Sequence, residues 1–190
     1  MSSHHIVKEK QEPALFILDF DGFDEEYFGQ LLEWSPTLIV TESCYEEIAS
    51  MSIKIDAVIC ENNDSIHFQE SIRFIYKSNS QSFLEKGMAF LIKEGYPAVN
   101  VICKHFNAVN FTGYIDKINT VIFANHKKYY PIKSGFNKWS LKNCSIEVFN
   151  GEPFEYYGLQ KGNTNNFITL KDGFYGFTFE KKHLFIAEDL

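Results

Sequence analysis

Arginine is almost missing from this sequence. Arg73 is the only arginine among the 190 residues, and the formal net charge is -7 at pH 7. Proteins that bind nucleic acid neutralise its phosphates with clustered lysine and arginine side chains. The shortage of arginine and the acidic balance therefore argue against a nucleic-acid partner. A phosphate group on a small ligand would have to be held by lysine, by backbone amides or by a metal ion.

Long apolar runs and paired cysteines are also missing. No segment approaches the roughly 20 apolar residues that a membrane-spanning helix requires, and the first residues, MSSHHIVKEKQEP, lack the apolar centre of a signal peptide. The four cysteines form no CxxC pair, which argues against zinc and redox motifs and favours buried free thiols. We therefore expect a cytoplasmic protein with no membrane partner.

Apolar and aromatic residues are plentiful instead. Hydrophobic residues make up 45% of the chain, with 19 phenylalanines and 10 tyrosines, which is a globular composition. Strand-like apolar runs occupy residues 14–20, 37–43, 56–62, 71–78 and 98–106, and helical patterns occupy 21–35, 44–53 and 82–96. Strands that alternate with helices are typical of a parallel sheet covered on both faces.

The character of the sequence changes after residue 113. Short aromatic and β-branched runs are broken by glycine-containing turns, and no good helical pattern remains, which is typical of an antiparallel sandwich or barrel. Residues 172–188 have the pattern of a closing hairpin. We therefore predict an α/β domain over residues 1–113, with a parallel-type sheet flanked by helices, followed by a small antiparallel β-sandwich domain over residues 114–190.

A polar cluster follows the third strand-like run, in the stretch IDAVICENNDSIHF. The apolar residues lead directly into Glu61, Asn62, Asn63, Asp64 and Ser65. Open α/β sheets bind their ligands at the carboxyl ends of strands, so the cluster could form a metal or phosphate site. Asn, Asp and Ser also favour turns for local hydrogen-bonding reasons. A polar turn without a ligand is therefore the alternative interpretation.

A second acidic cluster follows the first strand-like run. Asp19, Asp21 and Gly22 resemble the D-x-D-G start of phosphatase sites that use an aspartate nucleophile. The remaining residues of such a site have no convincing counterparts downstream. The alternative is an acidic entry to the first helix, which the helix dipole favours.

The order of segments over residues 15–188 resembles that of the thiamine pyrophosphokinase family. The resemblance implies transfer of a pyrophosphoryl group from ATP to thiamine with Mg²⁺. It also implies a homodimer in which the α/β domain holds the nucleotide and the β domain helps to hold thiamine.

Two family motifs fall at the ends of the second and third strands. The family's D-G pair corresponds to Glu42 and Ser43, and its G-D-x-D-S motif ends at Asp64 and Ser65, with Glu61 in place of the first aspartate if one residue is inserted. The resemblance implies that Glu61 and Asp64 hold Mg²⁺, since this ion accepts one or two protein carboxylates. It places Glu42, Ser43 and Ser65 near the nucleotide phosphates.

Two further motifs are altered. In the T-D-x-x-K motif the lysine survives as Lys86, which would neutralise phosphate, but the acid has become Phe83. The glycine-rich turn that ends in R-x-D-H corresponds to a segment with Ala108, Asn110 and Phe111 and no glycine. A phosphate-cradling turn needs glycines for close backbone approach and arginine as a forked cation. We therefore expect catalysis to be impaired or lost.

The β half carries a looser resemblance. Gly158, Gly162 and Asn165, in YYGLQKGNTNN, match a glycine-containing segment and polar turn that the family places near thiamine. Trp139 could stack on a flat cationic ring. The alternative for Trp139 is a core aromatic of the β-sheet.

Two functional hypotheses follow. In an active protein, Glu61, Asp64 and Lys86 would be the catalytic residues, with Mg²⁺ and ATP as cofactors and a thiamine-like or nucleotide-like small molecule as ligand. The alternative is a catalytically silent ligand-binding or dimeric scaffold protein. In both cases we expect a homodimer, because a sandwich of roughly 70 residues is too small to bury so many aromatic rings alone.

Overall fold

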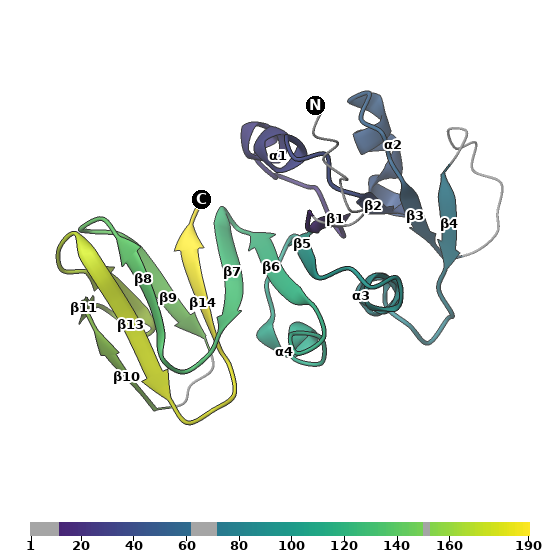
Figure 1. The fold of residues 1–190 in the computed structure, drawn as a ribbon. Coiled ribbons are helices and arrows are strands. Elements are labelled where there is room, and N and C mark those ends of the chain that lie inside the picture. The colour runs from purple at the N-terminus through teal and green to yellow at the C-terminus, as the bar shows by residue number, and fades with distance from the viewer. Residues whose placement is uncertain (1–11, 62–71, 150–152) are drawn as a thin grey trace, which may run out of the picture. The chain divides into compact units, whose positions relative to one another are not determined.

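The computed structural model describes residues 12–61, 72–149 and 153–190 (Figure 1). The chain divides into two compact units. Unit 1 comprises Met1–Lys104 and Asp116–Thr120, and unit 2 comprises His105–Ile115 and Val121–Leu190. The described strands include both parallel and antiparallel pairs, and the α/β class predicted from the sequence is confirmed.

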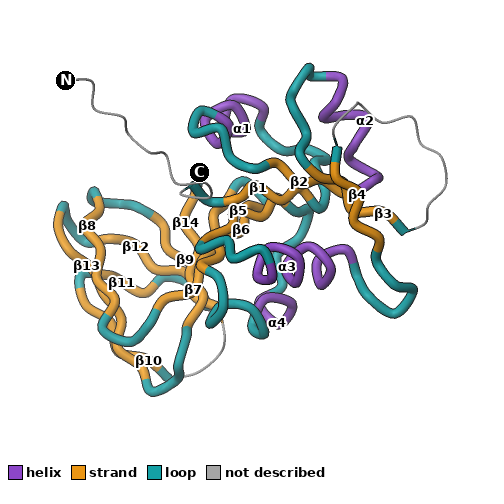
Figure 2. Tube along the Cα trace, turned by 45° about the vertical axis from the view of Figure 1, so that its right-hand side comes forward, coloured by secondary structure: helices purple, strands orange, loops and turns teal. Residues whose placement is uncertain are grey.

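Unit 1 contains the parallel strands. Its elements are β1 (Ala14–Ile17), α1 (Glu25–Leu32), β2 (Leu38–Thr41), α2 (Glu42–Ser50), β3 (Ala57–Cys60), β4 (Arg73–Tyr76), α3 (Phe83–Lys93) and β5 (Ala98–Ile102). The strands pair in the order β5–β1–β2–β3–β4, and each of these pairs is parallel. In both views α1 and α2 lie on one side of these strands and α3 lies on the other (Figures 1 and 2).

The apolar runs explain the central strands of unit 1. Every residue of β1, β2 and β3 is buried. A parallel strand covered on both faces needs such a continuous apolar run, because neither side of the pleat faces water. Helix α3 begins with a capping box at Ser82, in which the Ser82 Oγ accepts from the Glu85 amide at 3.1 Å and the Glu85 carboxylate accepts from the Ser82 amide at 2.7 Å.

Gly87 lets helix α3 approach strand β1 very closely. A Cβ atom at this position would lie 2.3 Å from the Cε1 and Cζ atoms of Phe16 and 3.0 Å from the Cδ1 atom of Ile59. Phe16 is fully buried. The helix therefore packs on the sheet at a distance that only glycine permits.

Unit 2 contains the antiparallel strands. Its elements are α4 (Ala108–Phe111), most of β6 (Asn119–Ala124), β7 (Lys127–Ile132), β8 (Phe136–Ser140), β9 (Ser145–Phe149), β10 (Phe154–Tyr157), β11 (Leu159–Lys161), β12 (Asn166–Thr169), β13 (Gly173–Phe179) and β14 (Leu184–Asp189). One set of strands pairs in the order β6–β7–β14–β9–β12–β11. A small second sheet has the order β10–β13–β8.

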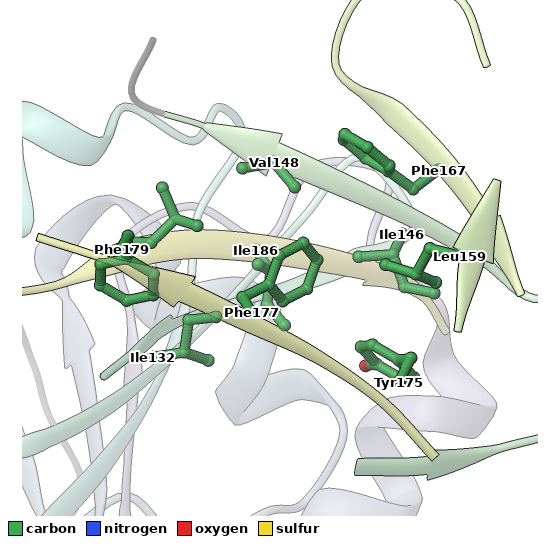
Figure 3. Close-up of a cluster of buried hydrophobic side chains, with 10 residues drawn as sticks. Ile132, Ile146, Val148, Leu159, Phe167, Tyr175, Phe177, Phe179 and Ile186 are labelled. Atoms are coloured by element: carbon green, nitrogen blue, oxygen red, sulfur yellow. The ribbon is translucent and has the colours of Figure 1, made fainter. Parts of the chain in front are cut away.

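Side chains from both sheets of unit 2 share one core, as Figure 3 shows. Tyr175, Phe177 and Phe179 come from β13 in the small sheet, and residues such as Ile146 and Ile186 come from the other sheet. This shared core makes unit 2 a two-layer β structure. Within residues 120–149 and 153–190 the structure has no helix, as the sequence pattern predicts.

The predicted closing hairpin is wrong. β13 pairs with β10 and β8, whereas β14 pairs with β7 and β9. The residues between them therefore carry the chain from one sheet to the other. Both strands contribute apolar residues to the shared core. Two apolar strands joined by a short polar segment are also the pattern of a hairpin, so the sequence does not distinguish the two arrangements.

The cysteines are free thiols in the structure. Cys44 and Cys60 are buried, and Cys103 and Cys144 are partly buried. Among the described helices, none is long and apolar enough to cross a membrane.

Candidate functional site

The candidate site of unit 1 lies where three neighbouring parallel strands end. β2 ends at Thr41, β3 at Cys60 and β4 at Tyr76, and the register pairs Thr41 with Ile59 and Cys60 with Tyr76. Parallel strands have their carboxyl ends at the same edge of a sheet, where open α/β sheets bind ligands. The residues that directly follow the strands are Glu42, Glu61 and Lys77, which we call the strand-end cluster.

The strand-end cluster is joined by direct contacts. The Lys77 ammonium lies 2.8 Å from the Glu61 Oε1 atom. The Glu61 backbone amide donates to the Glu42 Oε2 atom at 3.1 Å, and the Lys77 amide donates to the Cys60 carbonyl at 2.9 Å. Two carboxylates and one ammonium therefore meet at this edge.

Lys77 is almost buried, whereas Glu61 is not. The Lys77 side chain is 9% exposed and the Glu61 side chain is 52% exposed. The Lys77 ammonium also lies 5.1 Å from the centre of the Phe83 ring. An ammonium removed from water is costly unless a counter-charge compensates it. Glu61 supplies that charge, and the face of Phe83 adds a cation–π contact.

The other side chains at this edge are poor nucleophiles or are engaged with the protein. Burial, and secondarily the charge of Glu42, raises the pKa of Cys60 to about 11. Its thiol therefore stays protonated at neutral pH and is not a nucleophile. The Thr41 hydroxyl donates to the Leu18 carbonyl at 3.2 Å and lies 3.0 Å from the Ser43 hydroxyl.

The structure brings together some of the residues proposed from the sequence. Glu42 and Glu61 meet through the hydrogen bond described above, and Ser43 lies beside them in the first turn of α2. Strand β2 ends two residues earlier than expected, so Glu42 begins a helix. Asp64 and Ser65, like Asn62 and Asn63, lie outside the described residues.

Lys86 lies in a different place from the strand-end cluster. It lies on α3 and lines a groove of about 340 Å³ against β4, together with Arg73, Phe90 and Lys93. In the described part of the chain the lysine that contacts Glu61 is Lys77, which our sequence analysis missed. The available signal was its position, since Lys77 directly follows its strand as Glu42 and Glu61 follow theirs.

Comparisons with known proteins identify the fold. No family model matches the chain, and no curated protein matches it in sequence. Among solved structures, thiamine pyrophosphokinase from Bacillus subtilis matches with a TM-score of 0.61 and 13% identity, covering 94% of this chain and 99% of that one. The thiamin pyrophosphokinase from Geobacillus thermodenitrificans has a TM-score of 0.68 and 8% identity, covering 93% of this chain and 97% of that one. The thiamin pyrophosphokinase from Candida albicans has a TM-score of 0.63 and 10% identity, covering 94% of this chain and 90% of that one.

The chain has the thiamine pyrophosphokinase fold. The likeness extends over nearly the whole of each chain, while identity is very low. The resemblance predicted from the order of segments is therefore confirmed at the level of the fold.

The segment that corresponds to the glycine-rich turn of thiamine pyrophosphokinases lies in unit 2 and is held by aromatic packing. The Phe106 ring stacks on Tyr129, with 4.1 Å between centroids, and meets Phe149 and Phe185 at 5.4 Å each. The Asn107 side chain accepts from the Val109 amide at 3.1 Å and caps α4. This short helix was not predicted. The chain here is anchored by its own side chains.

Two glycines proposed for the thiamine side of the fold have structural roles. Gly158 has a φ of +73°, and a Cβ atom there would lie 2.5 Å from the Phe174 carbonyl oxygen. The backbone conformation and the close packing at position 158 therefore require glycine, whether or not a ligand binds there. The Gly162 amide donates to the Asn166 carbonyl at 2.8 Å, which closes the turn between β11 and β12. The Asn165 carbonyl accepts from the Val148 amide at 2.9 Å.

Trp139 is not a core aromatic, so that alternative interpretation is wrong. It is 52% exposed, and its register partner Phe174 is 61% exposed. Both alternate with inward residues, since Tyr175 next to Phe174 is fully buried. Tyr157 is also exposed and lies over Gly176 on the same outer face of the small sheet. We call Trp139, Phe174 and Tyr157 the outer aromatic face.

The acidic cluster after β1 is the entry to the first helix. The Asp24 side chain caps α1 by accepting from the Tyr27 amide at 2.7 Å. Asp21 forms an ion pair with Lys104 at 2.7 Å, and this hydrogen bond and charge hold the pKa of Asp21 below its usual value. Asp19 accepts from the Asp21 amide at 3.0 Å. These contacts match the helix-entry interpretation rather than a phosphatase site.

The two carboxylates of the strand-end cluster are engaged by groups of the chain itself. Within the described residues, no group of three or more His, Cys, Asp or Glu side chains is arranged to hold a metal ion. Glu61 already has the Lys77 ammonium against its carboxylate, and Glu42 accepts from a backbone amide. A dication on Glu61 would lie close to that ammonium, and like charges repel. Of the proposed ligands, only Glu61 can be judged, because Asp64 lies outside the described residues.

Proposed function

We propose that this protein uses the thiamine pyrophosphokinase fold to bind a thiamine-like or nucleotide-like small molecule and does not transfer pyrophosphate. The observation that carries this proposal is the anchoring of the segment around α4. Phe106 is packed among four aromatic rings, and Ala108 and Asn110 stand where the family has its arginine and aspartate.

Without the family's arginine and aspartate, the segment around α4 lacks the charged groups on which pyrophosphoryl transfer depends. Transfer of a phosphoryl or pyrophosphoryl group relies on positioning and on positive groups that stabilise the charge of the transition state. The one arginine of the chain, Arg73, donates to Glu94 at 3.0 Å on another edge of unit 1. Lys77 is committed to Glu61. Lys77, the cation that directly follows β4, is therefore engaged by a carboxylate of the chain itself.

Binding without turnover is compatible with the same geometry. The strand ends still carry the partly exposed carboxylate of Glu42 and the exposed hydroxyl of Ser43. Such groups recognise the amino and hydroxyl groups of a heterocyclic or ribose-containing ligand by hydrogen bonds. The position of the site at the carboxyl ends of parallel strands supports a binding role.

The test compares turnover with binding. The purified protein is incubated with thiamine, ATP and Mg²⁺, and thiamine diphosphate and AMP are measured by chromatography beside the Bacillus subtilis enzyme as a positive control. We expect no thiamine diphosphate above the background without protein. Calorimetry with thiamine, with ATP–Mg²⁺ and with both then identifies the ligand. Product formation would refute the proposal, and absence of all binding would favour the scaffold function.

We propose in addition that the chain forms a homodimer through the outer aromatic face. Exposed aromatic neighbours such as Trp139 and Phe174 are typical of interfaces. Light scattering at high micromolar concentration should give twice the monomer mass, and the double substitution Trp139→Ser with Phe174→Ser should give a monomer. Trp34→Ser is the matched control, because Trp34 is 70% exposed but lies in unit 1. A wild-type monomer, or a dimer that survives the double substitution, would count against this interface.

A further inference from the structure

Lys77 is directed at Glu61 by the geometry of the sheet. The register of β3 and β4 pairs Cys60 with Tyr76, and the Lys77 amide continues the ladder by donating to the Cys60 carbonyl. The next residues along the two strands, Glu61 and Lys77, are therefore neighbours. Side chains alternate along a strand, so Lys77 lies on the same side as the buried Ile75 and opposite the exposed Tyr76. The ion pair follows from the register and is not a chance contact between surface side chains.

The surroundings of Lys77 keep its ammonium in place. The side chain is 9% exposed, and its charged end lies between the Glu61 carboxylate and the ring of Phe83. If Glu61 were committed to a metal ion, the ammonium would lose its counter-charge while almost buried, which is strongly unfavourable. Metal binding at Glu61 therefore works against the burial of Lys77.

A divalent cation would also meet direct repulsion. Mg²⁺ binds carboxylate oxygens at about 2.0–2.1 Å in a near-ideal octahedron, which leaves it within a few ångströms of any other group on that carboxylate. Here that group is an ammonium 2.8 Å from Glu61. The second carboxylate, Glu42, accepts from the Glu61 amide and so ties the backbone of the cluster together.

We propose that Lys77 is the resident cation of the strand-end cluster and replaces a divalent metal there. Glu61 is then a counter-ion to Lys77 and not a metal ligand. A ligand that reaches these strand ends meets an ammonium supplied by the chain, and its binding at Glu61 and Lys77 is independent of Mg²⁺. This inference goes beyond the proposed loss of turnover, since it concerns how charge is balanced at the site.

The test measures metal binding directly, with Mn²⁺ as the probe and no nucleotide or thiamine present. Free Mn²⁺ is followed by electron paramagnetic resonance during titration of four proteins: the wild type, Glu61→Gln, Lys77→Met and the double variant Lys77→Met with Glu61→Gln. We expect the wild type and Glu61→Gln to give superimposable titrations. Lys77→Met keeps the apolar stem and removes the charge, so it should bind Mn²⁺ about tenfold more tightly than the wild type. The double variant should lose that gain.

Matched controls separate this effect from a general change in charge. Lys93→Met removes a lysine charge from unit 1 outside the strand-end cluster and should leave Mn²⁺ affinity unchanged. Lys77→Gln, which is neutral but still donates to Glu61, replaces Lys77→Met if that variant does not fold, as judged by circular dichroism. It should show the same gain in Mn²⁺ affinity.

Three results would overturn the inference. The first is a tenfold loss of Mn²⁺ affinity in Glu61→Gln. The second is an unchanged Mn²⁺ affinity when Lys77 is neutralised, and the third is a higher Mn²⁺ affinity that persists in the double variant. The turnover assay has a separate readout. A protein that makes thiamine diphosphate but passes the Mn²⁺ test would refute the proposed function and leave the role of Lys77 intact.

Discussion

Replacement of Gly87 by alanine tests the close packing of α3 on β1. Alanine at a helix interior is favoured over glycine by about 1 kcal/mol, so propensity alone predicts a more stable protein. The new Cβ atom would lie 2.3 Å from the ring of Phe16, where ordinary contacts begin at 3.4 Å, so the ring or the helix must move. Phe16 is fully buried, so its ring can move only by displacing other core side chains.

The steric cost should exceed the gain in propensity. Overpacking of a filled core costs about 1–3 kcal/mol, and the displacement required here places Gly87→Ala at the upper end of that range. We expect a net loss of about 2 kcal/mol, which corresponds to a fall in melting temperature of about 4–8 °C for a chain of this size. Urea unfolding followed by far-ultraviolet circular dichroism reports on this change, because all the described helices of eight residues or more lie in unit 1.

The matched control is Gly29→Ala in α1. A Cβ atom at Gly29 meets nothing within 4 Å, so the same chemical change should stabilise the protein, by up to about 1 kcal/mol. Phe16→Leu should partly rescue Gly87→Ala, with a coupling energy of about 1 kcal/mol in a double-mutant cycle. A Gly87→Ala protein as stable as the wild type, or independent effects of the two substitutions, would refute the reasoning.

Three further substitutions test contacts in both units. Burial is the largest single influence on Glu188 and would raise its pKa, but hydrogen bonds from Lys138 and Tyr175 and the charges of Lys138 and Lys128 together hold that pKa below the ordinary value of 4.5. The stabilisation is therefore complete above about this pH and is lost as the pH falls through the folded-state pKa. Glu188→Gln should therefore lower stability at neutral pH by about 2 kcal/mol and flatten the acid side of the profile from urea unfolding; parallel profiles would contradict this. Thr169 is buried and donates to the Leu141 carbonyl at 2.5 Å, so Thr169→Val should cost about 2 kcal/mol in chemical unfolding while Thr169→Ser keeps most of the stability. Ser82→Ala removes the capping box of α3 and should cost about 1 kcal/mol in thermal unfolding, whereas an equal loss in Ser82→Thr would argue against the cap.

The sequence predicted those features that depend on local patterns. The apolar runs of β1, β2 and β3 and the capping box of α3 are short-range signals, and each marks an element of the structure. Features that depend on pairing across the chain were not predictable in the same way. The register of β3 and β4, which makes neighbours of Glu61 and Lys77, leaves no mark in the sequence around either residue.

Other errors also have physical causes. The pattern around β13 and β14 fits a hairpin and a crossing between two sheets equally well, because both arrangements place two apolar runs on either side of a short polar segment. The alternative interpretation of Trp139 as a core residue rested on its large aromatic ring, but its position in the alternation of β8 points it outward. For the candidate site, the strand ends were predictable, whereas the contact of Lys77 with Glu61 depends on the register of β3 and β4.

The position of β14 has a consequence for the order in which unit 2 can fold. β14 follows all the other strands in the sequence, yet it lies between β7 and β9 in the sheet. A chain that ends before residue 184 therefore has two separate groups of strands, β6–β7 and β9–β12–β11, whose facing edges have no partner. Their edges are templates for pairing with other chains. During synthesis, unit 2 can close its sheet only after β14 has left the ribosome, so its folding is late and depends on contacts that are distant in the sequence.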